Sequence, residues 1–213
     1  MTTEMLASAR PSRTERTRAA LIAAGLDLLV ERPIEGIAID ELVARAGVAK
    51  GSFFNHFADK HAFAAAVASE VRAELEAEIA RANDARADPV ARIAWGMTVA
   101  AAFARRKPDR ARVLLRHQST AARADDPLNR GLKDDLDAAH AAGLLRAEAA
   151  ASGLPYWLGL CQVVMIIMVE THPSRAEAEV RLGEMLAMGL AGLGIAEDRA
   201  AAVTAEVLTG WEV

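Results

Sequence analysis

Cysteine and aromatic side chains are scarce in this chain. Cys161 is the single cysteine among 213 residues, and Phe, Trp and Tyr together make up 4%. One thiol forms no intrachain disulfide and supplies no cysteine cluster for a metal, which excludes the disulfide-stapled class of secreted proteins. Glycine shows no period, which excludes a collagen-like chain. The cysteine usage is compatible with a reducing cytoplasm.

Long apolar runs are also missing. The longest one, residues 157–169, is interrupted by Gln162 and is too short to span a bilayer. The first residues are polar and lack the apolar segment of a secretory signal. We therefore expect a cytoplasmic protein with no membrane partner.

Alanine is the most abundant residue type, with 49 of the 213 positions. Alanine is the strongest helix former, whereas β-branched and aromatic residues favour strands. Hydrophobic residues at 53% and charged residues at 25% fit a folded soluble chain. The composition predicts an all-α protein of one or two small domains.

Seven prolines divide the sequence into helix-sized segments. Proline is tolerated where a helix begins and disrupts a helix interior. With the spacing of apolar residues, this predicts about ten helices and no strand. Their expected ranges are 14–31, 39–46, 50–57, 60–83, 90–106, 109–120, 128–145, 155–171, 174–193 and 197–208.

The net charge of −4 hides a local basic segment. Residues 1–60 hold eight Lys or Arg and eight Asp or Glu, so the excess of acid lies in the remainder of the chain. Near the N-terminus Arg10, Arg13, Arg16 and Arg18 face only Glu15. This distribution is compatible with a nucleic-acid partner, although an exposed terminal tail would have the same composition.

Residues 39–57 have the pattern of a helix-turn-helix. Two short helical segments flank Gly47, where small residues let the helices meet closely. If Phe53 and Phe57 are buried, the remaining face of the second helix is polar. That face carries Lys50, Ser52, Asn55 and His56, side chains that can bond to bases or phosphates.

The segment RAALIAAGLDLLVERPIEGIAIDELVARAGVAKGSFFNHFADKHAF, residues 18–63, resembles the N-terminal domain of the TetR family of transcriptional regulators. Its most specific part is AGVAKGSFFNHFADK, and the likeness covers residues 14 to about 75. The resemblance implies a flexible basic arm over 1–13, a DNA-binding domain over 14–75 with its helix-turn-helix at about 38–57, and a helical effector-binding and dimerisation domain over 76–213.

The resemblance also implies which side chains contact DNA. Lys50, Ser52 and Asn55 would face the major groove, while Phe54, His56 and Lys60 stand at positions that contact phosphates in the family. The complete predicted set is Arg13, Arg18, Arg45, Lys50, Ser52, Phe54, Asn55, His56 and Lys60. Taken singly, Lys50 and Lys60 would be ordinary solvated lysines, and His56 a packing residue beside Phe57.

Several positions depart from the family pattern. Phe54 replaces the usual tyrosine, which favours an apolar contact such as one to a thymine methyl group. Ile37, Ala38 and Ala49 stand where small hydroxyl residues are usual, and a lost helix cap costs about 1 kcal/mol. We therefore expect the arginines of residues 10–18 and Lys60 to carry more of the attraction to DNA.

Two predicted helices, 155–171 and 174–193, are too apolar to be left uncovered. We predict that they form the interface of a symmetric dimer, with a monomeric core as the alternative. The predicted interface residues are Val164, Met168, Leu182, Met185, Leu186, Gly189, Leu190 and Leu193.

The resemblance also implies that the C-terminal domain encloses a small molecule that controls DNA binding, and apolar stripes with a few polar groups would fit a mostly apolar effector. Simple core packing would produce similar stripes. The predicted effector-binding residues are Trp95, Thr98, Val99, Phe103, Arg116, His117, Trp157, Cys161 and Met165.

No pattern typical of catalysis or metal binding is present. The five histidines are scattered, and HExxH, GxSxG and phosphate-binding glycine patterns are missing. Cys161 lies in an apolar helix and is expected to be an inert thiol. We predict no enzyme activity, no metal and no cofactor.

The sequence thus predicts a homodimeric repressor that binds a near-palindromic operator in double-stranded DNA and is released by an effector. Two alternatives remain open. One is an activator or ligand-independent regulator of the same fold, and the other is a ligand carrier or scaffold dimer whose DNA-binding motif has decayed.

Overall fold

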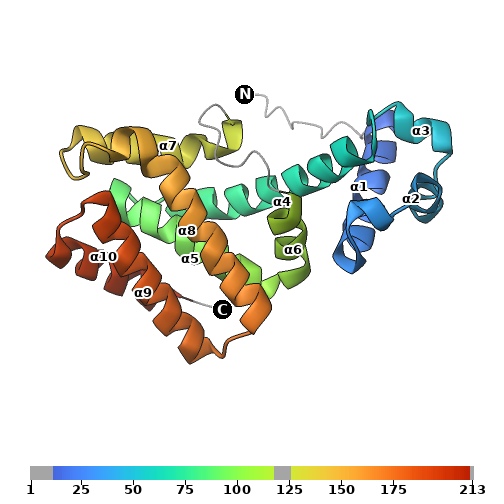
Figure 1. Cartoon of the computed structure of the whole chain (residues 1–213). Coiled ribbons are helices and arrows are strands. Elements are labelled where there is room, and N and C mark those ends of the chain that lie inside the picture. Colours follow the sequence, from blue (N-terminus) through green and yellow to red (C-terminus); the bar gives the residue numbers. More distant parts are fainter. Residues whose placement is uncertain (1–11, 118–125, 212–213) are drawn as a thin grey trace, which may run out of the picture. The chain divides into compact units, whose positions relative to one another are not determined.

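The computed structural model describes residues 12–117 and 126–211, and over these residues the chain is helical without strands (Figure 1). The ten α-helices are α1 (Arg13–Glu31), α2 (Ile39–Ala46), α3 (Lys50–Phe54), α4 (Lys60–Asn83), α5 (Pro89–Arg106), α6 (Pro108–His117), α7 (Arg130–Ala141), α8 (Ala149–Thr171), α9 (Arg175–Leu193) and α10 (Glu197–Thr209). Short 3₁₀ turns occupy Ile34–Gly36 and Pro127–Asn129. The all-α prediction is confirmed. The arm predicted over residues 1–13 lies almost wholly outside the described residues.

The chain divides into two compact units, an N-terminal unit up to Val67 and a C-terminal unit from Ala68 onward. The division falls inside α4, so one continuous helix contributes residues to both units. Phe63, Ala64 and Val67 of α4 are buried in the core. The N-terminal unit otherwise consists of α1, α2 and α3.

Three phenylalanines form the centre of the N-terminal unit. The ring centroids of Phe53, Phe57 and Phe63 lie 4.9–5.5 Å apart, and the three side chains are buried. Gly25 of α1 lets Phe63 approach closely, because a Cβ atom there would lie 2.2 Å from the Phe63 ring. This cluster fixes α3 against α4, although α3 itself has only five residues.

The helix ends of the N-terminal unit are capped unequally. Ser12 and Glu15 form a reciprocal capping box at the start of α1. Ala38 and Ala49 precede α2 and α3 and provide no side-chain cap. As the sequence predicts, α2 and α3 therefore begin without a hydrogen bond from a side-chain hydroxyl.

In the C-terminal unit α5 is the central helix, packed against α7, α8 and α10. Alanines such as Ala94, Ala101 and Ala104 are fully buried along it. Small side chains let neighbouring helices approach α5 closely on several sides. This explains how a chain poor in aromatic residues still builds a continuous core.

The proline-based boundaries fail at α8. This helix begins at Ala149, and Pro155 lies inside it. Proline at the seventh helical position lacks the N–H group that would bond to the carbonyl of Ala151, but only this single bond is lost so near the helix start. The predicted helix over 128–145 is also too long, because Gly143 adopts a left-handed φ of 69° just after α7 ends.

Because α8 is longer than predicted, its apolar stretch is longer too. Over its 23 residues α8 is long and apolar enough to cross a membrane by length and composition, which the shorter predicted run was not. However, Trp157, Val164, Met165 and Met168 are almost fully buried within the single chain. α8 packs against α5, α6, α7 and α9, as the core helix of a helical domain does.

Candidate nucleic-acid interface and ligand cavity

The turn between α2 and α3 is closed by local hydrogen bonds. Gly47 ends α2 in the left-handed region with φ 67°, and the Val48 amide donates to the Val43 carbonyl oxygen at 3.0 Å. Leu42, Val43 and Phe53 are buried beneath the turn. Their burial leaves the polar face of α3 outward, as the sequence predicts.

The outward face carries the candidate DNA-reading side chains. Lys50 and Asn55 are exposed, and Phe54 is 53% exposed despite its apolar ring. Ser52 and His56 are half-buried at the edge of this face. An exposed aromatic ring beside exposed amide and ammonium groups offers both apolar and hydrogen-bonding contacts to a base edge.

Each of the lysines on this face has a partner in the free protein. Lys50 Nζ lies 2.8 Å from Asp40 Oδ1 across the turn, with both side chains more than half exposed. Lys60 Nζ donates to the Glu35 carbonyl oxygen at 3.0 Å. Such exposed pairs are worth little and are easily exchanged for another anion.

The three predicted arginines lie on other helices. Arg45 in the last turn of α2 is 4.0 Å from Asp27 and from Glu31 of α1. Arg18 lies over the Phe57 ring, 5.9 Å from its centroid. Arg13 is exposed and begins α1, so it belongs to a helix and not to the predicted arm.

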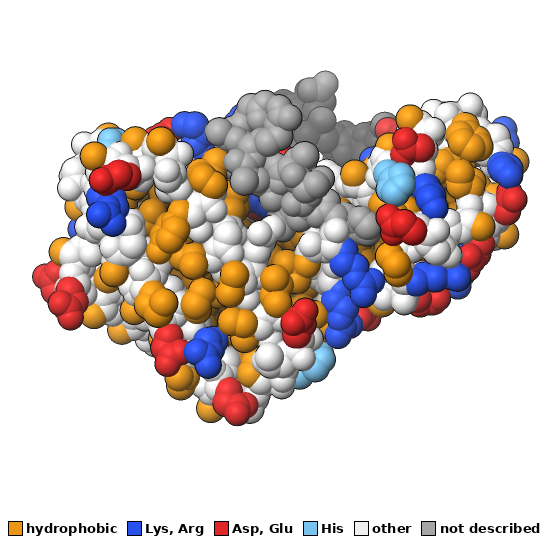
Figure 2. Space-filling view, viewed as in Figure 1, with side chains coloured by type: hydrophobic (Ala, Val, Ile, Leu, Met, Phe, Trp, Pro, Cys, Tyr) orange, Lys and Arg blue, Asp and Glu red, His pale blue; other side chains and the backbone are white. Residues whose placement is uncertain are grey.

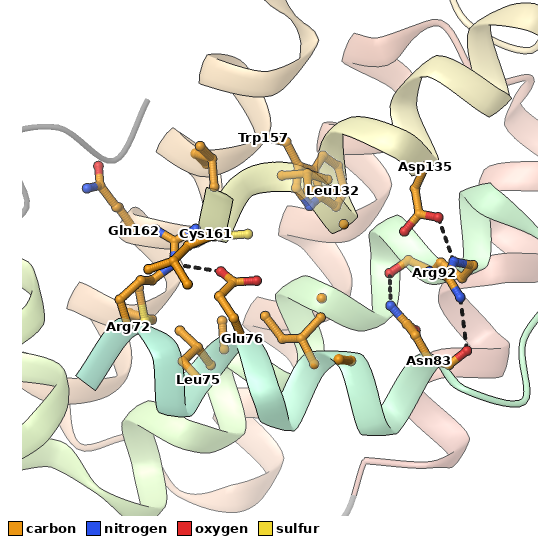
Figure 3. A pocket seen from close by; sticks show the side chains of 18 of the residues that line it. Arg72, Leu75, Glu76, Asn83, Arg92, Leu132, Asp135, Trp157, Cys161 and Gln162 are labelled. Atoms are coloured by element: carbon orange, nitrogen blue, oxygen red, sulfur yellow. Dashed lines mark hydrogen bonds and ion pairs between the residues drawn. The ribbon is translucent and has the colours of Figure 1, made fainter. Parts of the chain in front are cut away.

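The C-terminal unit contains a cavity of about 260 Å³ between α4, α5, α7 and α8 (Figure 3). Its size is just below the range of about 300–1,000 Å³ typical of ligand pockets. The lining is mostly apolar, with Leu75, Ile79, Leu132 and Met165 among the residues. Gly96 and Ala100 of α5 leave the space open because their side chains are small.

The structure brings together only part of the predicted effector set. Trp157, Cys161 and Met165 of α8 line the cavity. The α5 residues Trp95, Thr98 and Val99 line a different depression beside Gly210 and Trp211. They lie on the face of α5 turned toward the end of α10, while Gly96 and Ala100 form the cavity wall.

Phe103 and Arg116 of the predicted effector set also lie away from this cavity lining. Phe103 is fully buried in the core. Arg116 is exposed near the end of α6. His117 ends α6, and its side chain lies outside the described part of the chain. On α5 the sequence pattern points to Trp95, Thr98, Val99 and Phe103, whereas Gly96 and Ala100 of the same helix line the cavity.

An ion pair within α4 forms one end of the cavity lining. Arg72 Nε donates to Glu76 Oε1 at 2.6 Å, and its Nη2 donates to Asn129 Oδ1 at 2.8 Å. Burial raises the pKa of the Glu76 carboxyl, while the Arg72 guanidinium opposes that shift. Both charges are held in a largely dry setting.

A second ion pair in the cavity lining joins α5 to α7. Arg92 Nε donates to Asp135 Oδ1 at 2.5 Å, and Arg92 Nη1 donates to the Asn83 carbonyl oxygen at 3.1 Å. Burial raises the pKa of Asp135 against the opposing effect of Arg92. Figure 3 shows this ion pair and the Arg72–Glu76 pair in one view of the cavity.

Within the described part of the chain, two buried polar atoms at the cavity have no hydrogen-bond partner. They are the indole Nε1 of Trp157 and the side-chain Oδ1 of Asn83. Trp157 is 1% exposed and Asn83 is 4% exposed. Neither was paired with a polar function in the sequence analysis, because an unpartnered atom becomes apparent only after packing.

Cys161 also lines the cavity. Burial of its thiol among apolar atoms raises the pKa of Cys161 to about 12. The sulfur is therefore a protonated thiol at neutral pH, as expected for an inert cysteine.

The predicted dimer residues lie on α8 and α9. Val164, Met168, Leu182, Leu186, Gly189, Leu190 and Leu193 are buried within the single chain, and Met185 is half-buried. α8 packs on α9. These side chains are buried in the single chain, which fits the alternative of a monomeric core, and their place in a dimer interface stays a prediction.

Other apolar side chains of α8 and α9 face outward. Val163 and Ile166 are 45% and 37% exposed, and Val180 and Met188 are 63% and 67% exposed. Figure 2 shows hydrophobic side chains gathered over α8 and α9. This set is called the α8–α9 patch below.

Residues 21–67 match the family described as bacterial regulatory proteins, tetR family. The HTH-type transcriptional repressor DhaR of Mycobacterium sp. (strain GP1) is 38% identical over 74 residues, which cover 34% of this chain and 37% of the repressor. The match thus spans about a third of that relative's length.

Solved structures extend the likeness to the whole fold. A putative tetR family transcription regulator from Shewanella sp. PV-4 superimposes with a TM-score of 0.73 at 18% identity, covering 83% of this chain and 97% of that one. RolR in complex with resorcinol gives 0.59 at 17% identity, covering 92% and 96%. AibR in complex with isovaleryl coenzyme A and operator DNA gives 0.57 at 21%, covering 80% and 97%.

Proposed function

We propose that the chain is a cytoplasmic homodimeric repressor of the TetR type that is released from its operator by a small effector, because residues 21–67 match that family and a 74-residue segment is 38% identical to the repressor DhaR. Such a regulator is not an enzyme. The observation that carries the proposal is the outward face of α3, where Lys50, Phe54 and Asn55 stand together.

This face is suited to the major groove. Lysine bonds to the O6 and N7 atoms of guanine, asparagine bonds to adenine, and an apolar ring contacts the thymine methyl group. Lys60 and His56 flank this face and would contact phosphates, which position the protein without specifying sequence. Two such units would read half-sites in successive major grooves, about 34–36 Å apart.

The α8–α9 patch is the surface we assign to the second subunit. Val163, Ile166, Val180 and Met188 lie on the outward faces of two adjacent helices. Burying such a patch against its own symmetry copy would remove apolar surface from water in both subunits.

The cavity between α4, α5, α7 and α8 is the effector site of the proposal. RolR was solved with resorcinol, a ligand small enough for a cavity of this size, whereas the isovaleryl coenzyme A of AibR is far larger. α4 lines the cavity and also contributes Phe63 to the core of the N-terminal unit. An effector would act by favouring a dimer geometry whose half-site spacing no longer matches the operator, which requires different affinities for the two geometries.

Selection of bound duplexes from a random DNA pool at two salt concentrations tests the proposal. We expect an enriched inverted repeat and a steep loss of affinity with salt, because phosphate contacts release counterions. A pool without enrichment, with no binding even at low salt, would contradict it.

A ligand carrier with a decayed DNA motif is the second candidate. It is favoured by Ala38 and Ala49, which leave α2 and α3 without side-chain caps. Replacing Lys50, Asn55 and Lys60 together by alanine separates the two functions. A carrier would keep its cellular role after this change, whereas a repressor would lose it.

A further inference from the structure

We infer that the effector of the cavity is uncharged and offers both a hydrogen-bond acceptor and a hydrogen-bond donor. This inference rests on the proposed function, since it names the class of ligand for the same site. The charges of the described lining residues and two unpartnered polar atoms among them support it. Neither feature is part of the helix-turn-helix.

The charged side chains of the cavity neutralise one another. Arg72 pairs with Glu76, and Arg92 pairs with Asp135, so two cations meet two anions. The side chains of these pairs are between 10% and 30% exposed. Arg72 uses a further donor on Asn129, and Arg92 uses a further donor on the Asn83 carbonyl oxygen.

Among the described lining residues, an ionised ligand would therefore meet no free counter-charge. A carboxylate or phosphate would have to compete with Glu76 or Asp135 for its arginine, and the displaced carboxylate would remain buried and unpaired. A buried charge without a partner is strongly disfavoured. The two arginines thus hold the cavity together and are not available to recognise an anion.

Two atoms of the described lining residues do lack hydrogen-bond partners. The indole N–H of Trp157 is a donor without an acceptor, and Asn83 Oδ1 is an acceptor without a donor. Trp157 lies on α8 over the cavity, whereas Asn83 ends α4 beside Arg92 (Figure 3). Buried polar groups are rarely left unsatisfied, so a ligand that supplies a carbonyl or ether oxygen and a hydroxyl or amide N–H would complete both.

Cys161 provides a probe of this preference, because the chain contains no other cysteine. Iodoacetamide and iodoacetate are nearly equal in shape and differ in charge. In each reaction the Cys161 thiolate attacks the methylene carbon and iodide leaves. The thiolate fraction is common to both reagents, so the ratio of their rates isolates how the cavity responds to charge.

The experiment compares this rate ratio in the native full-length chain and in the same chain unfolded in urea, at neutral pH, with alkylation of Cys161 followed by mass spectrometry. We expect the native state to slow iodoacetate at least tenfold more than iodoacetamide. Equal slowing of the two reagents, or a native preference for iodoacetate, would overturn the inference.

Glu76→Gln tests the cause of the preference. The glutamine keeps an oxygen for the Arg72 hydrogen bond but removes the compensating charge, so native discrimination against iodoacetate should fall several-fold. Glu148→Gln is the matched control, because Glu148 pairs with Arg146 on the surface and lies outside the cavity lining. An equal effect of both substitutions would mean that overall charge, and not the cavity, sets the ratio.

A matched ligand pair tests the hydrogen-bonding part. 4-Phenylbutan-1-ol and 4-phenylbutyrate share one hydrocarbon skeleton, and the alcohol both donates and accepts. We expect the alcohol to protect Cys161 from iodoacetamide at several-fold lower concentration than the carboxylate, and Trp157→Phe to weaken that protection. Equal or better protection by the carboxylate would contradict the inference, and so would an alcohol that gives no protection at millimolar concentration.

The outcome is independent of DNA binding. A cavity that prefers neutral reagents in a protein that selects no DNA would support the inference and overturn the proposed regulation. A protein that selects an operator but whose cavity prefers anions would support the proposed regulation and overturn the inference.

Discussion

The two units of the molecule hold their cations in opposite ways. In the N-terminal unit Lys50 pairs with Asp40 at 2.8 Å, and the two side chains are 57% and 73% exposed. In the C-terminal unit Arg72 pairs with Glu76 at 2.6 Å, and the two side chains are 10% and 22% exposed. The distances are similar, whereas the surroundings are not.

This difference in exposure explains the different tasks proposed for the two units. An exposed pair contributes little to stability, so Lys50 can leave Asp40 for a base or phosphate at small cost. A buried pair that loses one partner leaves an uncompensated charge in a dry setting. The N-terminal unit is thus suited to exchanging charges with a polyanion, and the C-terminal unit to keeping its charges balanced around a neutral guest.

Breaking the buried pair should have the largest effect on stability. We expect Arg72→Ala to lower the free energy of unfolding by about 3–5 kcal/mol, because Glu76 is left buried without its cation. Lys50→Ala should lower it by less than about 1 kcal/mol. Urea denaturation followed by circular dichroism measures both, and a similar loss in the two variants would remove the contrast.

Removing a base-reading side chain should have the next largest effect, on affinity and not on folding. Asn55→Ala is expected to weaken binding to the selected duplex by about 1–3 kcal/mol, because one good side-chain contact to a base edge is lost. Fluorescence anisotropy measures it. Ser52 is half-buried at the edge of the same face, and Ser52→Ala should cost less. A loss of affinity that is equal for all duplex sequences would assign Asn55 to the backbone instead.

Restoring a missing cap should raise stability. Ala49 precedes α3 with extended backbone and no side-chain cap, so Ala49→Ser should add about 1 kcal/mol to the free energy of unfolding. Ala44→Ser, an exposed position inside α2, is the matched control and should give no gain. A gain of equal size at both positions would show that capping is not its source.

Removing the acidic partner of Lys50 should have a smaller effect. Asp40→Asn frees the Lys50 ammonium and removes a negative charge beside the DNA-reading face, so affinity for the duplex should rise by less than about 1 kcal/mol. The gain should diminish as salt increases, because exposed charges are screened. A loss of affinity would indicate instead that Asp40 itself contacts DNA.

The smallest expected effect is on the pH dependence of stability, which Glu76 and Glu15 should shift in opposite directions. Burial raises the pKa of Glu76, so the native state holds that proton to higher pH than the unfolded chain, and stability falls as pH rises through the raised pKa. Hydrogen bonds from Ser12 lower the pKa of Glu15, so its contribution is lost as pH falls through the lowered pKa.

Unfolding measured from acid to neutral pH, against Glu76→Gln and Glu15→Gln, checks this pair, with the effect of Glu15 at the acid end of the range. The difference between wild type and each variant should change with pH in opposite directions. Two parallel differences would contradict the assigned causes.

Local residues were sufficient to predict which side chains of α3 face outward. The boundaries of α2 and the outward face of α3 follow from a short segment in which Gly47 sets the turn and Phe53 and Phe57 set the buried face, whereas the all-α class follows from composition. No contact with a distant part of the chain is needed to decide which side chains of such a motif point outward. The pairing of Lys50 with Asp40 across the turn was not predicted.

The C-terminal site could not be derived in the same way. α5 is buried on nearly all sides, so its hydropathy does not distinguish the face that lines the cavity from the face that meets α10. α8 is equally apolar around its axis, and Val164 and Val163 differ by one position yet lie inside and outside the core. Which face of α5 or α8 is buried, lines the cavity or faces solvent depends on the helices that pack on each side of it.

The affinity of the selected duplex for wild type and for the variant with Lys50, Asn55 and Lys60 replaced by alanine, measured over a range of salt, tests the central claim most directly. The account predicts that the variant folds with unchanged stability within about 1 kcal/mol. It also predicts binding at least about 100-fold weaker and a salt dependence less steep by about one in the logarithmic slope for the lost Lys60 phosphate contact. Unchanged affinity and slope in a folded variant would contradict the claim that this exposed face exchanges its partners for DNA.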